Sequence, residues 1–311
     1  MNRGNIIQTT RGAHQISRTD RILVHEHVFN RYPFHKQEEM ERFVIDELTA
    51  AYKCGITVAC DLTAYTQPYN YYRIIAESPV EIVSCLGFYT PKYVPTQYSK
   101  ADALAIIKQF SKKIENGVGT KKIKPGILKI AANRDSLSEQ EIKQFRIIAT
   151  ISKEYNLPIA LHAPHNAYEH VCRLLDYGAA PGKVFVAHLE SGISNPDEFA
   201  KKINTAHRII KLGSYIQLAD FGCVSNSPKC ELCVSFACEL MSSGLIDHLL
   251  LSGDSSWRWK SAQFVVKEFN HGNGKHYTYT MDYSLPILQS RYSKLDLEQL
   301  FLLNNPSRLW E

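Results

Sequence analysis

The sequence contains neither a long apolar run nor a block of like charge. It has no stretch of about 18 uncharged apolar residues, so no segment is expected to span a membrane. The segment from Met1 to Asp20 is polar and lacks the apolar centre of a signal peptide. Basic residues stand at most in pairs, such as Lys121–Lys122, and the net charge is only +5, which disfavours a nucleic-acid partner. These absences predict a protein that acts on a small-molecule substrate, with no nucleic-acid or membrane partner.

The eight cysteines lack the arrangement of a disulfide framework. They are scattered through a long chain, which predicts reduced thiols in a cytoplasmic protein. Cys223, Cys230, Cys233 and Cys238 offer a structural zinc site as an alternative, because Cys230-x-x-Cys233 has ligand spacing. A zinc knuckle normally pairs two such units, and this one falls within an apolar helical pattern. The pattern favours small buried thiols in a core helix.

Length and composition fit one globular domain. The chain has 311 residues, of which 44% are hydrophobic and 22% charged. This length is large for a β-sandwich and suits an α/β barrel with a few longer loops. No linker or low-complexity segment interrupts the chain, so residues 1–311 are expected to form a single domain.

Strand and helix patterns alternate along the chain. Short apolar runs predict strands, and amphipathic stretches, several of them ended by glycine, predict helices. The first predicted strand begins at Ile22, and the others are 56–62, 81–89, 126–131, 158–162, 184–188, 215–218 and 248–252. The predicted helices are 36–54, 70–77, 99–115, 138–155, 166–177, 197–211 and 230–242.

Eight strands that alternate with helices predict a parallel sheet, and eight suit a closed (β/α)8 TIM barrel of the α/β class. Ser138 with Glu141 three residues later forms a capping box, which supports one of the helix starts. The alternative is an open, doubly wound sheet. No Gly-x-Gly-x-x-Gly follows the first strand, and this absence weakens that alternative.

The stretch Arg21–Phe29 carries the first chemical signal. Its apolar run, residues 22–24, predicts a strand that is buried on both faces. His25 and His27 follow, and residues two apart on a strand point to the same face. Two imidazoles at the end of a strand make half of a metal site. Two buried histidines bonded to neighbours remain the alternative.

Four further candidates fall at the ends of other predicted strands. Lys129 lies in the fourth strand, His162 ends the fifth, His188 ends the sixth, and Asp254 follows the eighth. The C-terminal ends of barrel strands meet at one rim, where barrel enzymes keep their chemistry. Together with the two histidines of the first strand, these residues are expected to form one constellation.

Four imidazoles and one carboxylate suit two divalent ions such as zinc, manganese, cobalt or iron. Lys129 differs, because an ammonium group cannot bind a metal. A neutral amine could react with carbon dioxide to give a carbamate, whose two oxygens can bridge two metals. An ammonium paired with Asp254 or Glu190 is the other interpretation, and the spacing does not decide between them.

The chain resembles the phosphotriesterase family of the amidohydrolase superfamily over nearly its whole length. The segments that carry the resemblance are His25-Glu26-His27, Gly126-Ile127-Leu128-Lys129, Leu161-His162, Ala187-His188, Gly253-Asp254 and Asn305-Pro306-Ser307-Arg308. Gly87-Phe88-Tyr89 also resembles the end of the family's third strand, where a tyrosine stands beside the metals.

The resemblance implies two bound metal ions, with zinc the first choice. It implies that His25, His27 and Asp254 bind one ion and that His162 and His188 bind the other. It further implies that carboxylated Lys129 and a hydroxide bridge the two ions, and that Asp254 and Tyr89 take part in catalysis. After His188 this chain has Glu190 where many relatives carry an aspartate.

The loop after the eighth strand indicates the kind of substrate. Arg258, Lys260, Lys275 and Tyr277 are predicted to bind it, and Gly272 and Gly274 let backbone N–H groups approach an anion. The loop resembles the glycine-bearing loop of the sugar-lactonase branch more than the apolar loop expected for long acyl chains. A solvated loop is the alternative for these cations.

These observations predict a binuclear metal-dependent hydrolase for an ester-like bond, and favour a lactonase for a polar or sugar lactone, with or without phosphate. A phosphotriesterase (aryldialkylphosphatase) and an acyl-homoserine lactonase are alternatives within the family. A metal-binding barrel without catalytic activity is the alternative outside it. A homodimer is a candidate assembly that the sequence does not decide.

Overall fold

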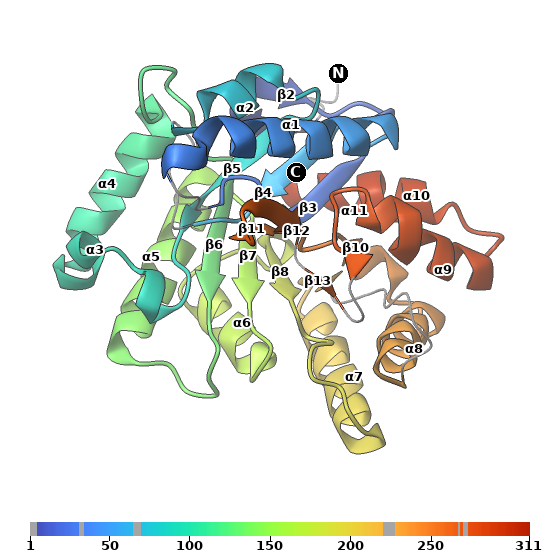
Figure 1. The fold of residues 1–311 in the computed structure, drawn as a ribbon. Coiled ribbons are helices and arrows are strands. Elements are labelled where there is room, and N and C mark those ends of the chain that lie inside the picture. Colours follow the sequence, from blue (N-terminus) through green and yellow to red (C-terminus); the bar gives the residue numbers. More distant parts are fainter. Residues whose placement is uncertain (1–4, 31–33, 65–69, 220–227, 267, 270–272) are drawn as a thin grey trace.

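Eight parallel strands form the centre of the molecule in the computed structural model, which describes residues 5–30, 34–64, 70–219, 228–266, 268–269 and 273–311. Each strand pairs with its neighbours in chain order, from β3 to β10. The strands are β3 (Ile22–Glu26), β4 (Val58–Asp61), β5 (Glu81–Gly87), β6 (Ile127–Ala131), β7 (Ile159–His162), β8 (Val184–Ala187), β9 (Tyr215–Leu218) and β10 (Leu249–Leu251). Helices surround these strands (Figure 1).

The last strand returns to the first. The N–H of Asp254 donates to the carbonyl of His25 at 3.0 Å, and the N–H of His27 donates to the carbonyl of Ser255 at 2.9 Å. The hydroxyl of Ser252 accepts the N–H of His25 at 3.0 Å. These contacts nearly close the sheet, so the predicted (β/α)8 barrel is confirmed and the open doubly wound sheet was the wrong alternative.

The helices up to Ser242 lie close to their predicted positions, whereas the helices that follow Ser242 were not predicted. They are α1 (Gln37–Lys53), α2 (Tyr72–Glu77), α3 (Thr96–Lys100), α4 (Ala103–Asn116), α5 (Glu139–Tyr155), α6 (Ala167–Asp176), α7 (Pro196–Lys211), α8 (Pro228–Ser242), α9 (Leu285–Arg291), α10 (Leu297–Gln299) and α11 (Asn305–Ser307). The capping box of Ser138 and Glu141 is present at the start of α5. No helix in the described ranges has the length and apolar character needed to cross a membrane.

The prediction of one continuous helix over 99–115 was wrong. The structure has two helices there, and α3 ends at Lys100. The Asp102 carboxylate accepts the N–H of Ala105 at 2.8 Å and so begins α4. An aspartate in this position favours a helix start over a helix interior, because its side chain competes for backbone donors.

Several antiparallel strand pairs lie outside the predicted elements. Strands β1 (Ile6–Thr9) and β2 (Gly12–Gln15) pair antiparallel near the N-terminus. Strands β11 (Trp257–Lys260) and β12 (Gln263–Val266) pair antiparallel within the segment that was predicted to be a loop, which also holds the short pair β13 (Glu268–Phe269) and β14 (Asn273–Gly274). Tryptophans alternate with cations along β11, a period of two that is typical of a strand.

The apolar core has two parts, separated by the strands. Alternate strand residues pack inside the barrel, together with Ile7, Leu309 and Trp310 from the two ends of the chain. The intervening strand residues pack against the surrounding helices. Side chains alternate between the faces of a strand, so this division follows from the pleat. Ile22, Val58 and Ile127 start their strands, so the terminal residues close the N-terminal end of the barrel.

Candidate active site

The predicted metal-binding residues meet at the C-terminal ends of the strands. His25 lies in β3, Lys129 in β6 and His162 at the end of β7, while His188 and Asp254 follow β8 and β10. A cavity of about 460 Å³ opens between them. Its lining residues are His25, His27, Asn30, Leu62, Tyr89, Lys129, His162, Pro164, His188, Ser191, Asp254 and Ser256.

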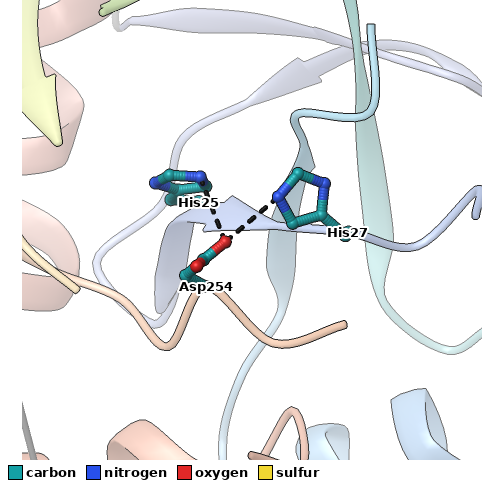
Figure 2. A group of neighbouring side chains, drawn as sticks. All are labelled: His25, His27 and Asp254. Atoms are coloured by element: carbon teal, nitrogen blue, oxygen red, sulfur yellow. Dashed lines mark ion pairs between the residues drawn. The ribbon is translucent and has the colours of Figure 1, made fainter. Parts of the chain in front are cut away.

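His25, His27 and Asp254 form the tightest part of the site. One ligand atom of each lies within 4.8 Å of those of the other two. Oδ1 of Asp254 lies 3.4 Å from Nε2 of His25 and 3.0 Å from Nε2 of His27 (Figure 2). Both imidazoles and the carboxylate point toward one another, as ligands of a common ion do.

Gln217 of β9 determines which ring nitrogen of His25 carries the proton. The Gln217 amide nitrogen donates to the carbonyls of Leu218 at 2.9 Å and Ser252 at 3.3 Å, so its oxygen faces His25. That oxygen lies 2.8 Å from Nδ1 of His25. An amide oxygen only accepts hydrogen bonds, so Nδ1 carries the proton and Nε2 presents a lone pair.

A cation fits between this lone pair and Asp254. Nε2 of His25 is buried and has no hydrogen-bond partner among the described residues, yet it faces a carboxylate oxygen. Burial and the nearby Lys129 ammonium hold the pKa of His25 well below its usual range, so a proton does not fill the gap. A divalent ion that takes nitrogen and oxygen ligands would satisfy both acceptors.

Lys129, His162 and His188 form the other half of the site. The ring centroids of His162 and His188 are 4.5 Å apart, and Nε2 of His188 lies 3.9 Å from Oδ2 of Asp254. Burial, with a smaller effect from the His188 charge, lowers the pKa of His162 to about 2, so its imidazole is neutral. Oδ1 of Asp254 thus faces His25 and His27, and Oδ2 faces His188.

Lys129 is almost fully buried in this half. Burial lowers the pKa of Lys129 to about 8, although the Asp254 carboxylate acts in the opposite direction. A lysine whose charge is disfavoured in this way holds more of the neutral amine, the form that is able to bind carbon dioxide.

The backbone at two of these residues is left-handed. His188 has φ of 67° and Asp254 has φ of 51°. Residues other than glycine adopt such angles at an energetic cost, which the surrounding contacts must offset. At Asp254 those contacts include its N–H bond to the carbonyl of His25.

Glu26 holds the segment that carries Asp254. Its carboxylate is fully buried and accepts the Ser252 hydroxyl at 2.8 Å, the Gly253 N–H at 2.9 Å and the Ser255 N–H at 2.7 Å. Burial raises the pKa of Glu26 to about 7, while these donors oppose the rise. Although the motif His25-Glu26-His27 was recognised, this role was missed, since it depends on contacts between the first and last strands of the barrel.

Tyr89 lies beside the second half of the site. It follows β5 and lines the cavity, and its ring meets His162 edge-on with centroids 5.5 Å apart. It also contacts Tyr93 at 5.5 Å. Its placement is compatible with the predicted catalytic role, which stays a prediction.

The structure does not bring the predicted substrate-binding residues into the cavity lining. Arg258 and Lys260 are exposed on β11. Lys275 is fully buried and donates to the carbonyl of Ala219 at 2.9 Å, and the Tyr277 hydroxyl donates to the carbonyl of His27 at 2.9 Å. Their substrate-binding role stays a prediction.

Polar residues that sequence reasoning missed line the cavity instead. Asn30, Ser191 and Ser256 each follow a barrel strand by a few residues, a position that was the only available signal. Glu190, between His188 and Ser191, is fully buried and accepts the N–H of Ala219. It therefore joins the ends of β8 and β9.

The candidate zinc site of the four cysteines lies partly outside the described residues. Cys223 is not described, nor is the side chain of Cys230. Gly272, from the predicted substrate loop, also lies outside the described residues. Cys233 and Cys238 lie on α8, as the helical pattern predicted, and form no disulfide.

The fold and the site define a barrel protein whose C-terminal rim holds a group of residues that could bind a metal ion. Residues 5–310 match the model of the phosphotriesterase family. The chain therefore belongs to the phosphotriesterase family, and this membership supports a hydrolase of that family.

Individual relatives are distant. An aryldialkylphosphatase of Saccharolobus solfataricus is 25% identical over 62% of this chain and 65% of its own length. A phosphotriesterase homology protein of Mycobacterium tuberculosis is 23% identical over 98% of this chain and 97% of its own. The solved organophosphorus hydrolase from Deinococcus radiodurans has a TM-score of 0.81 and 20% identity, covering 100% of this chain and 98% of that one. At this identity the structural likeness shows the fold.

Proposed function

We propose that this protein is a binuclear metal-dependent lactonase that hydrolyses a polar lactone, with sugar lactones as the favoured class. The observation that carries the proposal is the position of Asp254, whose two oxygens face His25 and His27 on one side and His188 on the other. Such an arrangement suits two neighbouring divalent ions that share ligands at a strand rim.

Two divalent ions, zinc by preference, would polarise the scissile carbonyl and supply an activated water when bound. His25, His27 and Asp254 would hold one ion, and His162 and His188 the other. Lys129, as a carbamate, would join them: its neutral amine nitrogen attacks the carbon of carbon dioxide, a nitrogen–carbon bond forms, and the nitrogen releases one proton to give the anion. The lowered pKa of Lys129 supports this reaction.

Asp254 is the general base of the proposal. A carboxylate beside the attacking water can accept its proton and pass it to the leaving oxygen of the opened lactone ring. Tyr89, with its ring against His162, would contact the substrate from the β5 side.

The lining of the cavity supports a polar substrate. Polar residues of the lining include Asn30, Ser191 and Ser256, whereas its aliphatic part consists of Leu62 and Pro164. A long acyl chain would need a continuous apolar groove, while hydroxyl groups on a sugar lactone match separate donors and acceptors. The size of about 460 Å³ fits a small ring compound.

The names of relatives define the competing activities. An aryldialkylphosphatase is among the relatives in sequence, and a lactonase and an organophosphorus hydrolase of Deinococcus radiodurans are similar in fold. Phosphotriester hydrolysis is therefore an alternative activity, since a tetrahedral phosphorus centre resembles the transition state of lactone opening.

The decisive experiment is a hydrolysis panel with zinc-loaded and manganese-loaded protein. The panel compares sugar lactones with and without phosphate, long-chain acyl-homoserine lactones and an aryl dialkyl phosphate, with a pH-indicator readout. We expect the largest kcat/KM for a sugar lactone. Turnover of acyl-homoserine lactones alone would contradict the substrate assignment, and metal binding without any turnover would favour the metal-binding barrel.

Metal content tests the binuclear centre separately. Elemental analysis should give close to two equivalents per chain, because six predicted ligands meet at the cavity. A reproducible value of one or none would contradict the binuclear model.

Lys129→Ala tests the carbamate. The variant should lose metal and activity, and a short carboxylic acid should restore part of both by replacing the missing anion. Full metal occupancy in Lys129→Ala without any added acid would show that no carbamate is needed.

A further inference from the structure

Thr63 connects the ligand His27 to a buried carboxylate. It lies just after β4 and is almost fully buried. Its hydroxyl oxygen is 2.9 Å from Nδ1 of His27 and 2.8 Å from Oδ1 of Asp61, the last residue of β4. Asp61 is itself almost fully buried and belongs to a strand that carries none of the predicted metal ligands.

The direction of each hydrogen bond follows from Asp61. Its Oδ1 accepts the N–H of Val28 at 2.7 Å and the N–H of Phe29 at 3.0 Å. An oxygen that accepts two backbone N–H groups does not carry the carboxyl proton, so Oδ1 acts as an acceptor and the Thr63 hydroxyl donates to it. A hydroxyl has one proton, so toward His27 it acts as an acceptor.

Nδ1 of His27 therefore carries the proton, and its Nε2 presents a lone pair. That Nε2 lies 3.0 Å from Oδ1 of Asp254, at the point where the proposed ion would sit. The side chain of His27 is 19% exposed, against 1% for His25, so packing restrains its ring less. The orientation of His27 depends more on the bond to Thr63 as a result.

We propose that Thr63 is a positioning residue that fixes the tautomer and ring orientation of His27 for metal binding, with Asp61 as its anchor. This inference rests on the proposed metal site. A neutral amide, Gln217, performs the same task for His25, whereas the chain through Thr63 ends on a carboxylate. Hydrogen-bond acceptors behind a ligand histidine raise its basicity and typically contribute about 10–100-fold to metal affinity.

Zinc affinity of the metal-free protein, measured by competition with a chelator, tests the inference. Thr63→Val keeps the shape of the side chain and removes the hydroxyl, and it should bind zinc about 10–100-fold more weakly. Thr63→Ser keeps the hydroxyl and should restore most of the affinity. Thr150→Val on α5 is the matched control, because its hydroxyl donates to the carbonyl of Arg146 within the helix.

Two further measurements separate positioning from simple support of the fold. Nitrogen NMR of the histidine rings in the metal-free wild type should show His27 protonated at Nδ1, and Thr63→Val should shift the proton toward Nε2. The thermal midpoints of metal-free Thr63→Val and Thr150→Val should agree within a few degrees. The rise in midpoint on adding zinc should be smaller for Thr63→Val than for the wild type.

The outcomes distinguish the two proposals. Wild-type zinc affinity in Thr63→Val, or an Nε2-protonated His27 in the wild type, would overturn the role of Thr63 and leave the metal centre intact. A wild-type protein that binds no zinc, manganese, cobalt or iron would instead overturn the proposed function.

Discussion

The two ends of the barrel differ in what they bury. At the C-terminal rim, His25, Glu26, Lys129 and Asp254 are all buried. At the opposite end, Ile7, Leu309 and Trp310 close the barrel among the apolar starts of the strands. One end therefore concentrates groups that are costly to bury, and the other concentrates apolar area.

Activity and stability therefore depend on opposite ends of the barrel. Buried imidazoles, carboxylates and an amine are unfavourable without partners, so the rim does not stabilise the fold by itself. The proposed ions and substrate would supply the missing partners. At the opposite end one buried amine, Lys183, donates to the carbonyl of Leu309 at 3.0 Å, while the apolar side chains there contribute to stability through burial. Substitutions at the two ends should accordingly separate activity from folding.

The largest effect is expected at the rim, for Asp254→Asn. The amide keeps the size of the side chain but cannot accept the proton, and loss of a general base typically costs about 10²–10⁴-fold in rate. Steady-state kinetics of the metal-loaded variant would measure the loss. Turnover near that of the wild type would place the base elsewhere.

At the apolar end, Trp310→Ala should act on stability instead. Trp310 is 9% exposed and donates its indole N–H to the carbonyl of Gly126 at 3.1 Å. Removing a buried tryptophan typically costs about 3–5 kcal/mol in the free energy of unfolding. Denaturant titration measures it, with Leu104→Ala as the control, because Leu104 is 70% exposed.

If Trp310→Ala lowered kcat of the folded protein as much as Asp254→Asn does, the separation between the two ends would be incorrect.

Glu26→Gln challenges the comparison, because Glu26 belongs to the rim and yet joins the first strand to the last. The amide nitrogen would face one of the three donors that the carboxylate now accepts. We expect about 1–3 kcal/mol lower stability of the metal-free protein, the usual cost of leaving a buried donor without an acceptor. An unchanged denaturant midpoint would show that Ser252, Gly253 and Ser255 need no carboxylate.

The smallest effect is expected at the ion pair between His276 and Glu47, which ties the segment after β14 to α1 outside both ends. Nδ1 of His276 lies 2.9 Å from Glu47, and the hydrogen bond to Glu47 raises the pKa of His276 above its usual value. A raised histidine pKa means that the pair stabilises the fold below about pH 6.5, and that this contribution is lost as pH rises through the folded-state pKa.

Because the His276 side chain is 50% exposed, the pair should contribute at most about 1 kcal/mol and weaken with salt. The unfolding free energies of the wild type and Glu47→Gln should therefore differ at about pH 5.5 and converge at about pH 8.5. A difference that grew with rising pH would contradict the assignment.

The repeating pattern of strands and helices was sufficient to predict the barrel and the meeting of six residues at its rim. Lys129 and His162 lie in successive strands and His188 directly follows the next one; parallel strands end at the same edge, so local order along the chain implies proximity in space. The antiparallel strand pairs, the break at Asp102 and the helices after Ser242 were missed because the local patterns there are short or weak and compete with turn and capping preferences.

The partners of the metal-binding histidines could be decided only by the tertiary structure. Gln217 is 192 residues from His25 in the chain, and Thr63 is 36 residues from His27. Lys275 resembles a surface cation in the sequence, yet its ammonium lies buried against the carbonyl of Ala219. Periodicity reports which face of a strand a residue occupies, whereas a hydrogen bond between strands depends on how the whole barrel closes.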